Sequence, residues 1–136
     1  MDNVWRPLEN TQVYRVSNPN VLAVISLYGS LQVFAQTSMA ELRQKSELLT
    51  GYLESLLKPL PHFVIITPER VSERGCQLPL LFDDGYMERV FGALEKAGIV
   101  VDERKPNVIR VAPTPLYNTF ADVYGFYLIL KQIVES

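Results

Sequence analysis

The sequence has few of the residues and patterns on which common chemical sites are built. It holds one cysteine, Cys76, which excludes an intramolecular disulfide bond and a metal site made of several thiolates. Its seven glycines are isolated and form neither a GxGxxG motif nor a P-loop, so no nucleotide fingerprint is present. The 13 basic and 15 acidic residues leave a net charge of −2, which lacks the broad positive surface of a nucleic-acid partner.

Long hydrophobic runs are also lacking. The longest apolar stretch, residues 21–33, is interrupted by Ser26, Ser30 and Gln32 and is too short and too polar to span a bilayer. The first ten residues, MDNVWRPLEN, carry no pattern of a signal or transit peptide. We therefore expect no membrane partner, a reducing compartment and a cytoplasmic location.

What the sequence does contain is typical of one globular domain. It has 136 residues, of which 48% are apolar and 21% charged, and this length is enough to bury a core. No internal repeat or low-complexity tract is present. We expect a single domain over residues 1–136, with a lead-in segment at 1–17, two helices at 18–58 and an α+β sandwich at 59–136.

Two helices are predicted in the first half of the chain. Asn18 is a preferred N-cap residue and Pro19 suits the first helical position. Residues 21–35 are apolar almost all round this helix, which predicts burial on more than one side by a core or by another chain. A capping box at residues 38–41 begins the second helix, which is predicted to end near Lys58 because two prolines follow.

The second half alternates between strand and helix patterns. Residues 62–67 and 76–82 are predicted strands, the second weakened by Pro79, which belongs at a sheet edge or a bulge. The remaining predictions are a helix at 86–97 stopped by Gly98, strands at 99–102 and 108–111 joined by a turn, and a last helix at 119–135. This order predicts the α+β class, with helices on one face of a mostly antiparallel sheet.

Two pairs of residues could carry chemistry, and each has a plainer interpretation. His62 and Cys76 could form a nucleophile pair, but surface or turn placement of the histidine and core packing of the cysteine are favoured. Asp83 and Asp84 could bind a metal or act in catalysis, but a turn with a helix N-cap fits their position before a glycine better.

Arg110 and Asn18 are more informative. Strand alternation places Arg110 on one face with Val108 and Ala112. A guanidinium among apolar neighbours needs an anionic partner, so Arg110 is either an edge-strand residue paired with an internal Glu or a fork that binds the carboxylate of a ligand. Asn18 is either a helix cap alone or part of an anion site at a helix start.

A family resemblance starts at Asn107, where the string NVIRVAPTPLYNTFADVY is similar to the C-terminal signature of kynureninases. Three further stretches agree in order and spacing, so that the resemblance covers nearly the whole chain: YRVSNP from Tyr14, LRQKSELLTGYLESLL from Leu42, and ERGCQL from Glu73. Pro79, Asn20 and Thr114 depart from the family's usual residues.

The resemblance implies the C-terminal α+β domain of a pyridoxal 5'-phosphate enzyme of the aspartate-aminotransferase class (fold type I). Such enzymes are cytoplasmic homodimers of tryptophan catabolism and NAD biosynthesis. They hydrolyse L-kynurenine or 3-hydroxykynurenine, small-molecule substrates, to anthranilate or 3-hydroxyanthranilate and L-alanine. The chain is similar to the last third only, and its five lysines match none of the cofactor motif. The Schiff-base lysine would therefore lie before Met1.

Two roles carry over by motif. Arg110 in IRVAP matches the arginine that binds the substrate carboxylate, and Asn18 in SNP matches an asparagine that reaches the cofactor and substrate across the dimer. No catalytic residue and no metal ligand is assigned. The first hypothesis is a part of a kynureninase that is inactive alone. The alternative is a binding or regulatory module that associates with a full-length partner.

Overall fold

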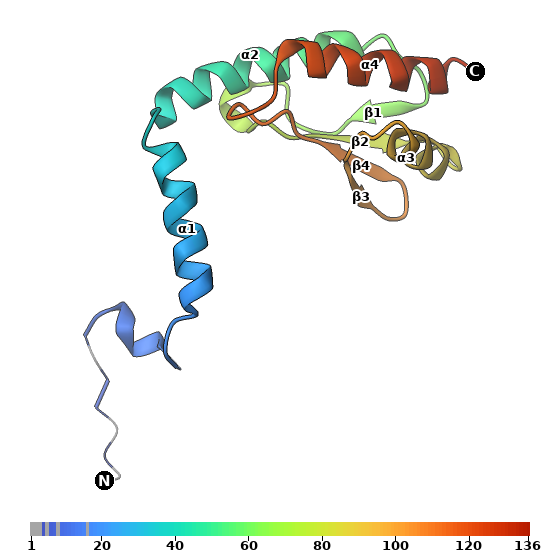
Figure 1. The fold of residues 1–136 in the computed structure, drawn as a ribbon. Coiled ribbons are helices and arrows are strands. Elements are labelled where there is room, and N and C mark those ends of the chain that lie inside the picture. The colour runs from blue at the N-terminus through green and yellow to red at the C-terminus, as the bar shows by residue number, and fades with distance from the viewer. Residues whose placement is uncertain (1–3, 5, 8, 16) are drawn as a thin grey trace. The chain divides into compact units, whose positions relative to one another are not determined.

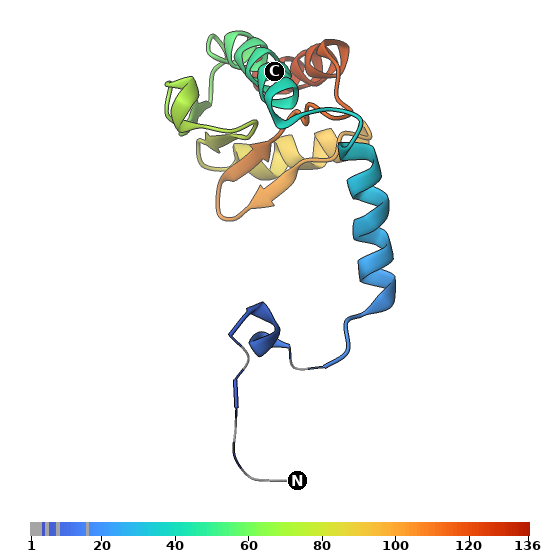
Figure 2. The same ribbon diagram turned by 90° about the vertical axis from the view of Figure 1, so that its left-hand side faces the viewer.

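The computed structural model describes residues 4, 6, 7, 9–15 and 17–136, and the chain forms two compact units, Met1–Ser38 and Met39–Ser136. The first unit holds a short 3-10 helix, η1 (Thr11–Tyr14), and helix α1 (Val21–Phe34) (Figures 1 and 2). All other elements belong to the second unit. The subdivision of residues 1–136 that the sequence suggests stays a prediction.

Helix α1 begins two residues later than the sequence predicts. Its N-cap is Asn20, whose side-chain oxygen accepts a hydrogen bond from the backbone N–H of Ala23 at 3.3 Å. The carbonyl of Asn20 accepts the first helical bond, from Val24 at 3.1 Å. The predicted Asn18 cap is therefore wrong, because Asn20 supplies both the side-chain and the backbone acceptor at this helix start.

No described side chain of α1 is buried, although the helix is apolar on every side. Val21 is 66% exposed, Ile25 59% and Tyr28 64%. Within its own unit the helix has no second α-helix or strand to pack on, as far as the described residues go. Among those residues no single helix is long and apolar enough to cross a membrane. Helix α1 and the next helix, α2 (Met39–Leu57), reach that length and composition only as a bent pair.

The second unit is an α+β fold with a four-stranded antiparallel sheet, as predicted. The strand order is β1-β2-β4-β3, and every neighbouring pair is antiparallel. Helices α2 and α4 lie side by side along the sheet (Figure 1). In chain order the elements are α2 (Met39–Leu57), β1 (Phe63–Ile65), η2 (Val71–Glu73), β2 (Leu78–Phe82), α3 (Tyr86–Lys96), β3 (Asp102–Arg104), β4 (Val108–Val111) and α4 (Phe120–Val134).

The core lies on one face of this sheet only. Along β2, Leu78, Leu80 and Phe82 are buried, whereas Pro79 and Leu81 between them are only partly covered. The buried residues meet side chains from all three helices of the unit. The helical contributors are Leu49, Leu53 and Leu57 of α2, Met87, Val90 and Leu94 of α3, and Val123, Phe126, Leu130 and Val134 of α4. The opposite face, which we call the open face, carries no helix.

Strand β2 is central, which corrects the prediction that Pro79 belongs at an edge or a bulge. Residues 78–81 pair one to one with β4, without an extra residue. The carbonyl of Pro79 accepts a hydrogen bond from Ile66 at 3.2 Å, so its nitrogen also faces β1. Proline has no backbone N–H, so Pro79 cannot donate a hydrogen bond toward β1. Because β1 ends at Ile65, the position opposite Pro79 lies just past the end of that strand. The sheet therefore loses no bond within the paired strands and tolerates the proline.

Strand β3 also differs from the prediction of residues 99–102. Gly98 stops α3 with φ +76°, as predicted, and the N–H of Ile99 then bonds back to Leu94 at 2.9 Å. This bond ties the chain to the helix end, so β3 starts only at Asp102, where the chain runs beside β4. Strand β4 has the predicted bounds.

Candidate functional site

Arg110 lies on the open face of the sheet, in strand β4. Burial alternates along β4 as predicted, with Ile109 and Val111 buried and Arg110 partly exposed, at 31% of its side chain. Strand β4 has neighbours on both sides, β2 and β3, so the interpretation of Arg110 as an edge-strand residue is wrong. Its cross-strand neighbours are Pro79 and Asp102.

The guanidinium of Arg110 has an anionic partner and also one buried donor without a partner. Its Nη2 forms an ion pair with Oδ2 of Asp102, and the same Oδ2 lies 3.0 Å from Nη2 of Arg104. The partner is thus an aspartate from the neighbouring strand, not the glutamate that was expected. The Nε of Arg110 is buried and has no hydrogen-bond partner. An N–H in that state lacks the acceptor that a buried donor needs.

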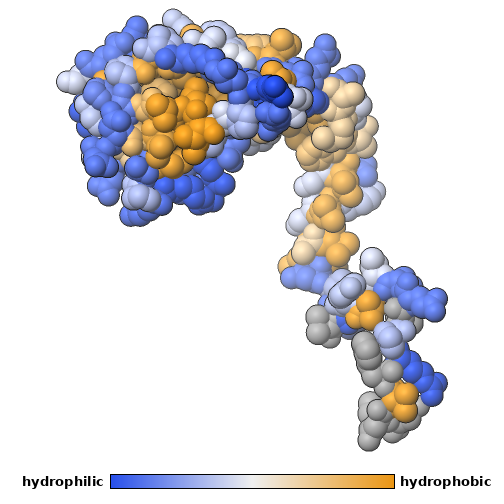
Figure 3. Space-filling model, turned by 180° about the vertical axis from the view of Figure 1, so that it is seen from behind, coloured by the Kyte–Doolittle hydropathy of each residue, from blue (hydrophilic) through white to orange (hydrophobic). Residues whose placement is uncertain are grey.

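Apolar side chains surround this arginine on the open face. Val64, Leu81 and Val108 follow one another across β1, β2 and β4 in the row next to it. Val64 is 57% exposed and Ile66 is 52% exposed. A hydrophobic patch is visible over the sheet, ringed by hydrophilic residues (Figure 3). A fork of N–H donors beside such a patch suits a ligand with a carboxylate at one end and an apolar body.

Asn18 belongs to the first unit, and its side chain is exposed. Its Oδ1 accepts a hydrogen bond from Nη2 of Arg15 at 3.0 Å, and Nε of Arg15 donates to the carbonyl of Ser17 at 3.1 Å. Asn18 therefore helps to close a polar turn before α1. Its role beside a cofactor stays a prediction.

The other candidate residues have structural roles. His62 has φ +70° in a turn; its Nδ1 lies 3.2 Å from Oδ2 of Asp83, and its ring stacks on Tyr86 with centroids 4.0 Å apart. Cys76 is a free, half-buried cysteine outside the buried core, so its predicted core packing is wrong. The predicted aspartate N-cap is wrong, because Gly85, with φ +82°, occupies the cap position of α3 and Asp83 bonds to His62 instead.

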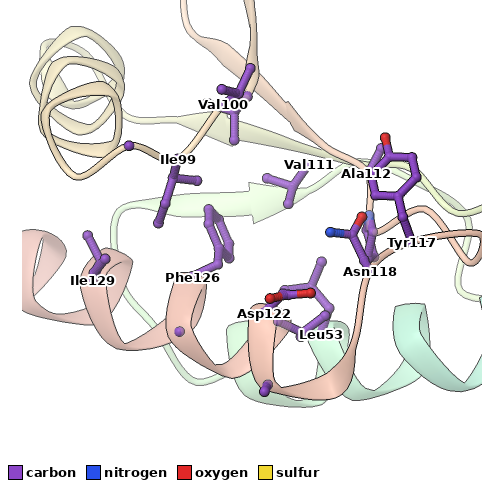
Figure 4. A pocket seen from close by; sticks show the side chains of 16 residues that line it. Leu53, Ile99, Val100, Val111, Ala112, Tyr117, Asn118, Asp122, Phe126 and Ile129 are labelled. Atoms are coloured by element: carbon purple, nitrogen blue, oxygen red, sulfur yellow. The ribbon is translucent and has the colours of Figure 1, made fainter.

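A groove of about 660 Å³ lies between α4, the end of β4 and the segment 98–101 (Figure 4). Ile99, Val111 and Phe126 point into it, and no lysine lines it. Its carboxylate, Asp122, is held in the capping box of α4 by Thr119, whose backbone N–H donates at 2.8 Å. This bond, with that of the Thr119 hydroxyl, lowers the pKa of Asp122.

The described residues do not fit pyridoxal phosphate by themselves. The cofactor needs an amine to form its imine, and the groove offers none. Three of the lysines are engaged in ion pairs: Lys58 with Glu54 and Glu69, Lys105 with Glu103, and Lys131 with Glu135. Nor does any cluster of three or more His, Cys, Asp or Glu that could hold a metal ion occur in the described part of the chain.

Sequence reasoning missed Asp102 and Arg104 as part of the site. Their alternation with Glu103 was a usable signal, since strand residues two apart share a face. That signal was hidden because the strand was predicted to end at Asp102, which left Arg104 in the turn. It also missed the buried pair of Arg74 and Glu54, whose Nη2 and Oε2 lie 2.5 Å apart.

Sequence comparisons match this chain to kynureninases over its whole length. Residues 42–130 match the family model of the kynureninase C-terminal domain. Kynureninases of Rattus norvegicus and Botryotinia fuckeliana are each 49% identical over the whole of this chain, which covers 31% and 30% of their lengths, and that of Homo sapiens is 48% identical. The chain thus spans about a third of the curated relatives it matches.

Solved structures agree on the fold. A NifS-like protein superimposes with a TM-score of 0.61 at 24% identity, covering 71% of this chain and 29% of its own. A C-DES mutant with glycine covalently linked to its PLP cofactor superimposes with a TM-score of 0.59 at 18% identity, covering 81% and 27%. The fold is that of the C-terminal parts of fold type I pyridoxal-phosphate enzymes. Together with the match over residues 42–130, this shows that the chain belongs to the kynureninase family.

Proposed function

We propose that this chain is the C-terminal, substrate-binding part of a kynureninase. Such an enzyme hydrolyses L-kynurenine or 3-hydroxykynurenine to anthranilate or 3-hydroxyanthranilate and L-alanine, with pyridoxal 5'-phosphate as cofactor. The observation that carries the proposal is a partly exposed arginine on the open face of the sheet, beside an apolar patch, in a chain of this family. The cofactor is then held by the remaining two-thirds of the enzyme.

Arg110 has the chemistry for the α-carboxylate of the substrate. A guanidinium forms two parallel hydrogen bonds to a carboxylate and thereby fixes its orientation as well as its position. The apolar patch formed by Val64, Ile66, Leu81 and Val108 lies beside that charge, where the apolar body of a ligand can pack on it.

The remaining parts of the proposal follow from the resemblance of the motifs. Asn18 contributes its amide near the cofactor and substrate of the neighbouring subunit, in a cytoplasmic homodimer. The exposed position of Asn18 supports this, because an asparagine that serves another subunit must be accessible from outside its own. Neither nucleic acid nor a membrane is a partner in this proposal.

A chimera tests the proposal directly. In rat kynureninase, the stretch that aligns with this chain is replaced by the 136 residues, which are 49% identical to it. We expect the chimera to release anthranilate from L-kynurenine, as followed by anthranilate fluorescence. A chimera that folds, dimerises and binds pyridoxal phosphate but shows no turnover would refute the proposed function.

A non-catalytic role is the second candidate. The exposed apolar side chains of α1 favour association with another protein, because a helix that is apolar on all sides is normally covered. In that case the chain is a binding or regulatory module that joins a full-length kynureninase. Co-purification of the chain with the full-length enzyme, without activity in the chimera, would favour this role, and so would the absence of an in-frame coding segment for the lysine-bearing domain.

A further inference from the structure

Asp102 stands between two arginines on the open face of the sheet. Strands β3 and β4 pair Asp102 with Arg110 and Arg104 with Val108, so these side chains share one face. One carboxylate oxygen, Oδ2, serves both guanidinium groups. The three groups carry a net charge of +1. Arg110 is therefore held by an anion without the cluster being neutralised.

The second observation is the unsatisfied donor of Arg110. Asp102 takes Nη2, while the buried Nε next to it has no acceptor in the structure. Arginine carries five N–H donors in a rigid plane, so fixing one edge of the plane sets the direction of all the others. An incoming carboxylate therefore meets a guanidinium that is already oriented, in a side chain that is 31% exposed.

We propose that Asp102 is a positioning residue, which fixes the guanidinium of Arg110 for the substrate carboxylate; this rests on the proposed function. The flexible arginine side chain loses its rotational freedom before the ligand arrives, so less is lost on binding. The carboxylate also separates two like charges. Without it, Arg104 and Arg110 repel each other across adjacent strands, and Arg110 leaves its position.

This arrangement predicts whether removal of Asp102 strengthens or weakens substrate binding. If Asp102 only competed with the substrate for Arg110, its removal would strengthen substrate binding. If it positions Arg110, its removal weakens the binding of carboxylate ligands and leaves other ligands unaffected. Strand positions suit this role because their side chains are held by the sheet, here by the short hairpin between β3 and β4.

The test compares variants of the rat chimera. We expect Asp102→Asn to raise KM for L-kynurenine roughly tenfold with a much smaller change in kcat. Asp102→Glu, which keeps the charge, should restore part of the loss. Glu103→Gln is the matched control, because Glu103 lies on the opposite face and pairs with Lys105 at 3.5 Å. It should keep the KM of the unmodified chimera.

Kynuramine, which lacks the α-carboxylate, provides the decisive readout. Its inhibition constant should be the same in the chimera and in Asp102→Asn. An unchanged or lowered KM for kynurenine in this variant would overturn the positioning role while leaving the proposed function intact. Equal loss of affinity for kynurenine and kynuramine would overturn it too, because Asp102 would then act on the fold. A cofactor-bound unmodified chimera without turnover would refute the proposed function itself, and this inference with it.

Discussion

At the scale of single residues, the local sequence pattern predicts the face of the sheet on which Arg110 lies but not its ion-pair partner. Alternation along VIRV is enough to place it on the face opposite Ile109 and Val111, and burial confirms this. The need for an anionic partner follows from the cost of leaving a guanidinium unpaired among apolar neighbours. The identity of the partner depends on the register between β3 and β4, which no local pattern encodes.

The first prediction concerns the geometry of this arginine. In the rat chimera, Arg110→Lys should lower kcat/KM for L-kynurenine by about 30-fold or more, because an ammonium cannot form two parallel bonds and loss of such a pairing costs about 2–5 kcal/mol. Arg70→Lys is the control, since Arg70 is 79% exposed and pairs only with Glu73 on the surface. Steady-state kinetics decide the outcome, and unchanged constants would leave Arg110 with a structural role only.

A second pair of residues controls stability rather than binding. Arg74 is 4% exposed and Glu54 12% exposed, and together they tie the segment before β2 to α2. The hydrogen bond from Arg74, helped by Lys58, lowers the pKa of Glu54 below its ordinary value of 4.5. The Glu54 carboxylate therefore binds a proton more tightly in the unfolded chain than in the folded chain. The stabilisation is complete above pH 4.5 and is lost as the pH falls through the lowered pKa.

We therefore expect Arg74→Met to destabilise the chain by about 3 kcal/mol at neutral pH, the lower end of the cost of breaking a buried pair, because Lys58 still contacts Glu54 at 3.2 Å. The variant should also lose less stability than the unmodified chain between about pH 5 and about pH 3, since its Glu54 pKa is lowered less. Urea unfolding at several pH values measures both effects. If the free energy of unfolding changed with pH equally in the two proteins, the pH dependence would not come from the Arg74–Glu54 pair.

At the scale of elements, helix α1 has an apolar sequence but no buried side chain among its described residues. Its side chains are apolar all round, yet Val21, Val24, Ile25 and Tyr28 are all more than half exposed. The sequence predicts that this helix is covered by a core or by another chain, and its own unit provides no core over the described residues. An apolar surface of this kind is normally covered by a partner.

The third prediction follows from that surface. The isolated chain should self-associate or be poorly soluble at micromolar concentration, as light scattering would detect. Replacing Val21, Ile25 and Tyr28 by Gln should reduce the association, because it removes apolar area at positions that no core needs. The same replacement at Leu48 of the second unit, which is 59% exposed, is the control. A stable monomer of the unmodified chain would contradict the prediction.

At the scale of the whole molecule, the chain spans about a third of its relatives' length and provides no amine for pyridoxal phosphate in its described groove. The fourth prediction is that the purified 136-residue chain does not hydrolyse kynurenine, because its described groove has no amine to hold the cofactor that withdraws electrons from the bond being broken. Anthranilate fluorescence with added cofactor measures this, with rat kynureninase as the positive control. Turnover above background would contradict it.

Features that depend on neighbours along the chain can be predicted from local sequence alone. The bounds of β4, the stop of α3 at Gly98 and the capping box of Thr119 and Asp122 all follow from local hydrogen bonds and alternation. The motifs at residues 107–124 and 14–19 also carried the family, which the comparisons confirm.

Features that depend on pairing between distant segments could be seen only in the folded chain. Pro79 reads as an edge residue, yet it lies in a central strand, because the donor it lacks would face the end of β1. The sequence predicts Asp102 as the last residue of a strand, yet it is the first residue of β3. The reason is that the N–H of Ile99 bonds to Leu94 at the end of α3, so the strand begins later. The Arg110 cluster exists through that shifted register, since hydrogen bonds between strands choose partners by the fit of the whole sheet rather than by adjacent residues.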